Sequence, residues 1–154
     1  MHDILRREFA RARRSNAKLS CLLIDIDRFK KINERYGHLQ GDSVLQRFSN
    51  LVNQTSRKAD FVWRRSGEEF LLILPETDRK GAECLANRLR QKTKTIPLYK
   101  LDNAEPIKDI RISISIGVAV YPDPRIHTED DLVELADEAL SRAKTKGKNR
   151  VMTA

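Results

Sequence analysis

The sequence has 154 residues, the length of one ordinary domain, and its 40% hydrophobic and 34% charged residues exclude an intrinsically disordered chain. It contains no apolar run of the roughly 18 residues that a membrane-spanning helix needs and no apolar core of a signal peptide, so we expect a cytoplasmic domain, either free or as the cytoplasmic part of a membrane-anchored protein. The formal net charge of +8 favours an anionic partner, which can be nucleic acid, an acidic membrane surface or a phosphate-rich ligand.

The first part of the chain predicts a helix followed by a strand. The charged segment to about Asn16 is compatible with a helix, and the apolar run Leu19–Ile24 has the length of a buried strand. Because side chains alternate between the two faces of a strand, Asp25 and Asp27 should lie on one side at its end.

A second helix and a β-hairpin are expected next. Apolar side chains within residues 42–53 form one helical stripe. Phe61–Arg65 and Phe70–Leu74 have the character of strands, and the Ser66-Gly67 pair predicts a tight turn between them. Gly67 suits this turn because glycine adopts positive φ without strain.

The second half of the chain predicts a helix over residues 82–89, a strand, a further helix and a short basic strand-like end, while residues 94–110 lack a clear pattern. Alternation of apolar and small polar residues marks the strand over Ile112–Val118, and Thr128 is placed to cap the helix that follows. This order predicts an α+β fold, with one mainly antiparallel sheet and helices packed on it.

Four carboxylates suggest the chemistry. Asp25, Asp27, Glu68 and Glu69 would form one cluster if the strands that carry them lie side by side. Phosphoryl transfer needs divalent metal ions held by hard oxygen ligands of this kind. Acidic pairs near strand ends and turns are also commonplace, so the cluster alone leaves a purely structural role open.

Two other kinds of site are disfavoured. Cys21 and Cys84 lie in apolar stretches without metal-ligand spacing, so we expect two buried, reduced thiols. Nucleic-acid binding through the basic ends of the chain is the least favoured hypothesis, because only 6% of the residues are aromatic and few can stack on bases. We therefore expect no nucleic-acid partner.

The sequence resembles the GGDEF domain family of diguanylate cyclases at four separated places. These are LLIDIDRFKKINERYGHLQGDSVLQ (residues 22–46), RKADFVWRRSGEEF (57–70), SISIGVAVYP (113–122) and ADEALSRAKTKGKNRV (136–151). The resemblance implies a ferredoxin-like, palm-type sheet with helices on both faces, as in class III nucleotidyl cyclases. It also implies the condensation of two GTP molecules into cyclic di-GMP and pyrophosphate by a head-to-head homodimer.

The same resemblance implies a role for each matching residue of the acidic site. Asp25 and Glu68 would be metal ligands, together with the main-chain carbonyl of Ile26, and Glu69 would assist metal binding or the attacking hydroxyl. These are hard oxygen ligands, suited to Mg²⁺ or Mn²⁺.

The implied GTP site has a guanine end and a phosphate end. Asn33 and Asp42 would hydrogen-bond the guanine edge, where an amide and a carboxylate match its acceptor and donors. The phosphates would be bound by Arg28, Phe29, Lys30, Lys144 and Lys148, close to the turn residues Ser66 and Gly67.

A third implied site binds the product cyclic di-GMP and inhibits the enzyme. Arg57 and Asp60 have the spacing before the turn that the family uses for this purpose, and Arg88 falls where a secondary arginine would lie. An arginine can fork onto a phosphate or a guanine edge, and a carboxylate can accept from guanine.

The sequence departs from the family at two places. Ser66 replaces the first glycine of the turn, and the usual Asp-Pro-Leu-Thr-Gly-Leu opening is missing. We expect residues 1–154 to form a single GGDEF-type domain, cut from a longer protein with an upstream sensory or receiver domain. Two functions remain open: an active cyclase, or a catalytically impaired module that binds GTP or cyclic di-GMP.

Overall fold

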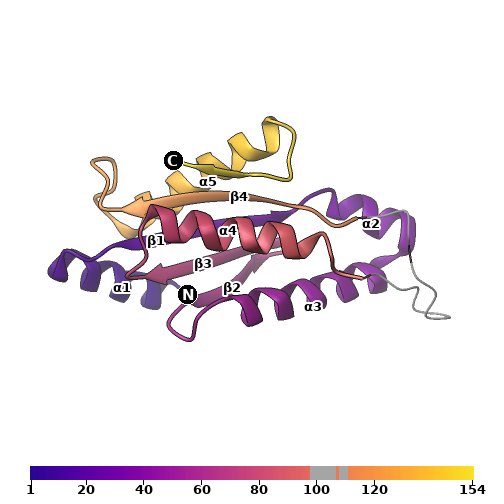
Figure 1. The fold of residues 1–154 in the computed structure, drawn as a ribbon, viewed down its shortest axis with the longest axis horizontal. Coiled ribbons are helices and arrows are strands. Elements are labelled where there is room, and N and C mark those ends of the chain that lie inside the picture. The colour runs from indigo at the N-terminus through magenta and orange to yellow at the C-terminus, as the bar shows by residue number, and fades with distance from the viewer. Residues whose placement is uncertain (98–106, 108–110) are drawn as a thin grey trace.

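A computed structural model describes residues 1–97, 107 and 111–154, and Figure 1 shows one sheet with helices on both of its faces. The sheet has five strands in the order β2-β3-β1-β4-β5. In chain order the elements are α1 (His2–Ser15), β1 (Leu19–Ile26), α2 (Phe29–Tyr36), α3 (His38–Thr55), β2 (Phe61–Ser66), β3 (Glu69–Pro75), α4 (Arg79–Thr93), β4 (Ile114–Tyr121), α5 (Glu129–Thr145) and β5 (Val151–Thr153).

The sheet is mainly antiparallel, as predicted. The central strand β1 pairs antiparallel with β3 on one side and with β4 on the other, and β2 pairs antiparallel with β3. Only the short edge strand β5 runs parallel to its neighbour β4. Every residue of β1 is buried, because helices cover both faces of the strand.

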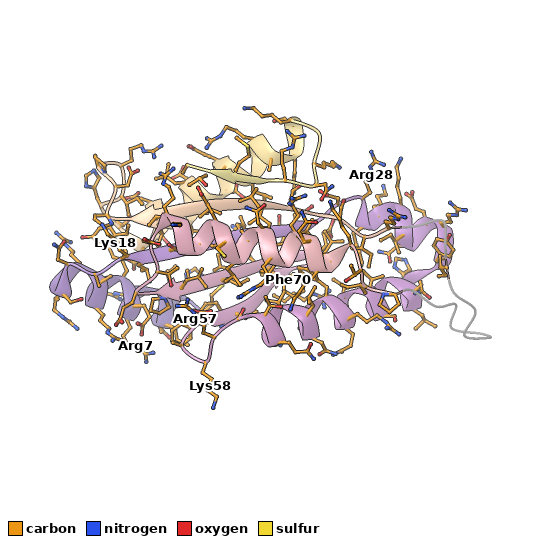
Figure 2. The ribbon with its side chains drawn as sticks, in the orientation of Figure 1. Arg7, Lys18, Arg28, Arg57, Lys58 and Phe70 are labelled. Carbon is orange, nitrogen blue, oxygen red and sulfur yellow. The ribbon has the colours of Figure 1, made fainter. Side chains whose placement is uncertain are left out.

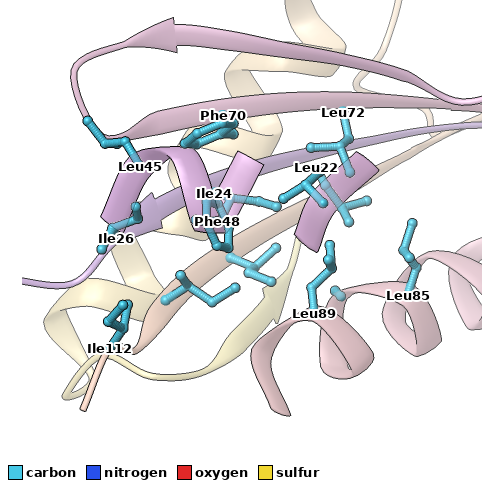
Figure 3. Packing of buried hydrophobic residues seen from close by; sticks show 14 of the residues in the cluster. Leu22, Ile24, Ile26, Leu45, Phe48, Phe70, Leu72, Leu85, Leu89 and Ile112 are labelled. Carbon is cyan, nitrogen blue, oxygen red and sulfur yellow. The ribbon is translucent and has the colours of Figure 1, made fainter. Parts of the chain in front are cut away.

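Two hydrophobic cores hold the helices on the sheet. Alternate residues of β1 face opposite ways: Leu22 and Ile24 belong to the core under α2, α3 and α4, whereas Leu23 belongs to the core under α1 and α5. Figure 3 shows the first core, in which Phe48 of α3 meets Phe70 of β3 edge to face with the ring centroids 4.9 Å apart. Burying such a side chain contributes about 1.5–3 kcal/mol.

Several predicted elements differ in detail. The single helix expected between β1 and the hairpin is two helices, because Gly37 has φ = 82° and breaks the chain direction between α2 and α3. β1 extends to Ile26, so Asp25 lies inside the strand and only Asp27 follows it. Cys21 is a buried free thiol as expected, but Cys84 is exposed, because it lies on the solvent side of α4.

The helix start predicted at Thr128 is confirmed. Thr128 caps α5 in a capping box with Asp131. The Thr128 hydroxyl accepts a hydrogen bond from the Asp131 N–H, and the Asp131 carboxylate accepts one from the Thr128 N–H. Most of the unpatterned segment 94–110 lies outside the described residues. Among the described helices, none is both long and apolar enough to cross a bilayer.

Candidate functional site

The acidic site is assembled by the pairing of β1 with β3. The register places Asp25 directly opposite Glu69, and the Ile26 N–H donates to the Glu68 carbonyl over 3.3 Å. The hairpin turn between β2 and β3 is therefore fixed beside the end of β1. Three carboxylates from two distant segments of the chain, Asp25, Glu68 and Glu69, are brought to one corner of the sheet, as predicted.

Lys144 of α5 completes this corner. Its Nζ donates to Asp25 Oδ2 over 2.7 Å, and the Asp25 side chain is only 12% exposed. Burial raises the pKa of the Asp25 carboxyl, the Lys144 ammonium lowers it, and the negative charges of Glu68 and Glu69 raise it again. Glu68 and Glu69 thus repel the Asp25 carboxylate, and the Lys144 ammonium offsets this repulsion.

Asp27 does not join the other acids. Its carboxylate accepts hydrogen bonds from the Ser113 hydroxyl at 2.7 Å, the Ser115 hydroxyl at 2.6 Å and the Asn149 N–H at 2.9 Å. It therefore ties β1 to the start of β4 and to the loop after α5. The expected cluster of four carboxylates is not formed, and the part of the chain that the structure describes holds no group of three or more His, Cys, Asp or Glu arranged for a metal ion.

A cleft of about 580 Å³ opens next to the acidic corner, between α2, the start of α3 and the hairpin turn. Asn33 lines it, and the Asn33 Oδ1 atom is buried without a hydrogen-bond partner, packed against Gly41. Asp42 is exposed on α3 and does not line this cleft. The cleft is lined by Phe29, Lys30, Asn33, Glu34, His38, Gly67 and Glu68, of which Glu34 and His38 were not predicted.

The predicted phosphate-binding residues fall into separate places. Lys30 lies at the cleft, where its ammonium is 3.7 Å from Glu34. Arg28, which precedes α2 with φ = 59°, and Lys148 line a different pocket. Lys144 instead pairs with Asp25. These cations thus lie in separate places and do not form one site.

The hairpin turn accommodates Ser66. Its hydroxyl donates to Glu69 Oε2 over 3.0 Å, and the Arg64 guanidinium donates to the Gly67 carbonyl over 2.7 Å. Gly67 has φ = 36°, whereas Ser66 is outside the positive-φ region. Only the second residue of the turn therefore needs the freedom of glycine.

Arg57 and Asp60 line another cleft, of about 600 Å³, together with Arg7 and Arg11 of α1. The Arg57 N–H donates to Asp60 Oδ2 over 2.7 Å, which fixes the turn before β2. Figure 2 shows Arg7 and Arg57 near each other, with Lys58 pointing away. Arg88 does not line this cleft, because its guanidinium donates to the Thr55 carbonyl over 2.9 Å.

The sequence is similar to one protein family over nearly its whole length. The family described as "Diguanylate cyclase, GGDEF domain" matches residues 1–150. The chain is 39% identical over 151 residues to the diguanylate cyclase DosC of Escherichia coli strain K12, an alignment that covers 96% of this chain and 31% of DosC. The chain thus spans about a third of the length of this relative.

Two solved structures share the fold. The GGDEF domain of DgcB from Caulobacter crescentus, in complex with c-di-GMP, aligns with a TM-score of 0.91 and 28% identity over 98% of this chain and 84% of that one. The active GGEEF domain of a diguanylate cyclase from Vibrio cholerae aligns with a TM-score of 0.87 and 34% identity over 98% and 92% of the two chains. The predicted palm-type α+β fold is therefore confirmed.

Proposed function

Because this chain belongs to the GGDEF domain family of diguanylate cyclases, we propose that it is an active cyclase that joins two GTP molecules into cyclic di-GMP as a head-to-head homodimer. The observation that carries this proposal is the β1–β3 register, which sets Asp25 opposite Glu69 and beside Glu68 at the mouth of a cleft. In the reaction, each 3′-hydroxyl oxygen bonds to the α-phosphorus of the other GTP and pyrophosphate leaves.

Each domain would bind one GTP along α2. Asn33, which lines the cleft, and Asp42, on the adjoining α3, would recognise guanine. The phosphates would be bound by Lys30, by the backbone at Arg28 and Phe29, by Lys144 in the last turn of α5 and by Lys148 after this helix. Charge-assisted hydrogen bonds of this kind are about twice as strong as neutral ones, so the phosphates anchor the nucleotide.

Asp25, Glu68 and the Ile26 carbonyl would hold Mg²⁺ or Mn²⁺. The donor set fits, because all three are hard oxygen ligands and because a cation would offset the burial and the repulsion by Glu68 and Glu69 that raise the pKa of Asp25. A bound divalent ion supplies charge neutralisation at the phosphates. Glu69, held by the Ser66 hydroxyl, would accept the proton of the attacking 3′-hydroxyl.

The conformation of Ser66 favours an active enzyme over an impaired module. A serine in place of glycine is harmful where the backbone needs positive φ, but Ser66 is outside that region. Its hydroxyl also has a productive partner in Glu69. The departure from the family pattern therefore leaves the turn unstrained.

We also propose that cyclic di-GMP binds at Arg57 and Asp60 and inhibits the enzyme. The cleft there carries Arg7 and Arg11 in addition, so its cations come from both α1 and the turn before β2. Arg88 lies on α4, outside the cleft, and would join this site only in contact with a second domain. The solved domain of DgcB was crystallised with c-di-GMP, which supports a product site in a relative of this fold.

The whole protein is proposed to carry an upstream sensory or receiver domain. DosC is about three times as long as the part that this chain matches, so most of that relative lies outside the shared domain. An input domain in the cytoplasm, free or attached to a membrane anchor, would bring two such catalytic domains together. We propose no nucleic-acid partner.

Incubation of the concentrated protein with GTP and Mg²⁺, followed by chromatography for cyclic di-GMP, tests the cyclase. Glu68→Ala should abolish product formation, whereas Glu134→Ala, which removes an exposed acid from α5, should leave it unchanged. Equal turnover by both variants would refute the assigned site. A protein that binds GTP but makes no product, also when a fused dimerisation domain holds two copies together, would support the impaired module.

The product site has its own test. Arg57→Ala should weaken inhibition by added cyclic di-GMP, while Lys58→Ala removes an equal charge from the neighbouring position, whose side chain points away from the cleft. Loss of inhibition in both variants would indicate a general charge effect instead of a site.

A further inference from the structure

A second pocket, of about 480 Å³, lies on the other face of α2 from the nucleotide cleft. Lys31 and Arg35 line this pocket from one face of α2, at a spacing of four residues, and Arg28 lines it from the position directly before the helix. Lys30 and Asn33 line the nucleotide cleft from a different face. The two cavities are thus separated by α2 itself, and Figure 2 shows Arg28 at the end of the molecule away from Arg57.

The pocket is strongly cationic. Among the residues that the structure describes, five basic side chains line it: Lys31 and Arg35 from α2, Arg28 directly before α2, Arg111 before β4 and Lys148 after α5, against one carboxylate, Asp27. Asp27 is already engaged, since two serine hydroxyls and a backbone N–H donate to it. Within the described part of the chain, no ion pair joins Arg28, Lys31, Arg111 or Lys148 to an acid.

The lining also indicates what kind of anion would fit. Guanidinium groups bind phosphate in a bidentate manner, and an ammonium adds a point charge. Among the described residues of the lining, Ile32 is the only one with an apolar side chain, and none has an aromatic ring on which a base would stack. These features favour the phosphate part of a ligand over a nucleobase.

We propose that this α2 basic pocket binds linked phosphate groups, and that its ligand is the pyrophosphate released by the cyclase reaction. The identification of the ligand rests on the proposed function. Arg28 and Lys148 are shared with the residues expected to bind the GTP phosphates, so the pocket continues the phosphate path past the beginning of α2. Lys31, Arg35 and Arg111 extend this path, and pyrophosphate would leave the nucleotide cleft toward the pocket.

Direct binding of sodium pyrophosphate to the metal-free protein, measured by titration calorimetry, tests the pocket without turnover. The double variant Lys31→Ala/Arg111→Ala should bind pyrophosphate about tenfold more weakly or worse. The matched control Lys58→Ala/Lys80→Ala loses the same charge at two exposed positions elsewhere and should bind as the parent protein does. Equal weakening in both double variants, or none in either, would overturn the proposal.

Two further measurements identify the source of the phosphates and separate this proposal from the cyclase. If the pocket holds released pyrophosphate, Lys31→Ala/Arg111→Ala should weaken product inhibition by pyrophosphate and leave the KM for GTP unchanged. A KM that rises in parallel would show that the pocket holds the phosphate tail of the nucleotide instead. Pyrophosphate binding in a protein without cyclase activity would refute the proposed function and the cyclase reaction as the source of the ligand, but not the phosphate-binding pocket. Cyclase activity without pocket-dependent binding would refute only this inference.

Discussion

Replacing Gly41 by alanine should weaken nucleotide binding and can also lower stability. A Cβ at this position would overlap the Asn33 Oδ1 atom and lie 3.0 Å from Asn33 Cγ and 3.1 Å from Phe29 Cζ. The Asn33 side chain can rotate away, since it is the end of a flexible group. The methyl group should therefore push the Asn33 amide out of the place from which it lines the nucleotide cleft.

The expected loss of stability and the expected loss of GTP affinity are of similar size. Overpacking a core costs about 1–3 kcal/mol, while replacing a glycine by alanine inside a helix returns about 0.5–1 kcal/mol. The net loss of stability is then about 0–2.5 kcal/mol, at about 2–4 °C in Tm for each kcal/mol in a domain of this size. Loss of one hydrogen bond to guanine costs about 0.5–1.5 kcal/mol, or about 2- to 13-fold in GTP affinity.

A double-mutant cycle isolates the contact between Gly41 and Asn33. GTP affinity would be measured by calorimetry for the parent, Gly41→Ala, Asn33→Ala and the double variant, with thermal unfolding of each. Gly41→Ala should weaken GTP binding in the parent but not in the Asn33→Ala background, because the displaced group is then gone. Affinity losses that simply add would refute the steric explanation.

Three further predictions concern other parts of the fold. Burial raises the pKa of the Cys21 thiol to about 12, so a thiol reagent should label one cysteine of the native protein, the exposed Cys84, and both after denaturation; two rapid reactions would contradict this. Gly117→Ala should destabilise the protein by at least about 1–3 kcal/mol in urea unfolding. The new methyl group would meet the backbone of α5, which cannot rotate aside. An unchanged midpoint of urea unfolding would be incompatible with this packing. Hydrogen bonds from Arg125 lower the pKa of Asp123 from 3.8 to about 2. This pair should therefore stabilise the fold above pH 3.8 and cease to do so as the pH falls through 2. NMR titration of Arg125→Ala should show the Asp123 pKa returning toward 3.8.

The sheet and the acidic corner were predictable because their signals are local. The apolar run of β1 and the glycine turn of the hairpin each specify an element within a few residues. Once two such strands pair antiparallel, the side chains at their ends must meet. The proximity of Asp25 to Glu68 and Glu69 could therefore be predicted from the sequence, whereas the register of the pairing between β1 and β3 came from the structure.

The boundary at Gly37 was less accessible. Residues on both sides have helical character, and a glycine within a helical pattern is tolerated in many proteins. Positive φ at Gly37 is decided by how α2 and α3 pack, since Phe29 and Ile32 must reach the same core as Val44. Tertiary packing thus selected a break that local propensity alone does not require.

The clefts could not be predicted because their walls come from distant segments. Arg7 and Arg11 face Asp60 only because α1 docks beside the turn before β2, and Arg111 joins Lys31 only because β4 begins next to α2. No periodicity links such positions. An arginine in a sequence is ordinarily interpreted as a solvated surface residue. The arginines of these clefts differ from ordinary surface arginines because several cations line one concave surface, and only the structure shows this.

Lys144 contacts the acidic corner in the structure, although the resemblance assigns it a different partner. The resemblance assigns it to the phosphates, and its ammonium lies 2.7 Å from Asp25, a residue 119 positions away. A buried carboxylate without a cation is costly, so Lys144 stabilises the charged form of Asp25. In the proposed site, Asp25 would hold a divalent ion that supplies this positive charge instead, and the Lys144 ammonium would then be available to the phosphates. Both proposed contacts need a cation at the same corner of the sheet, so one lysine would serve both.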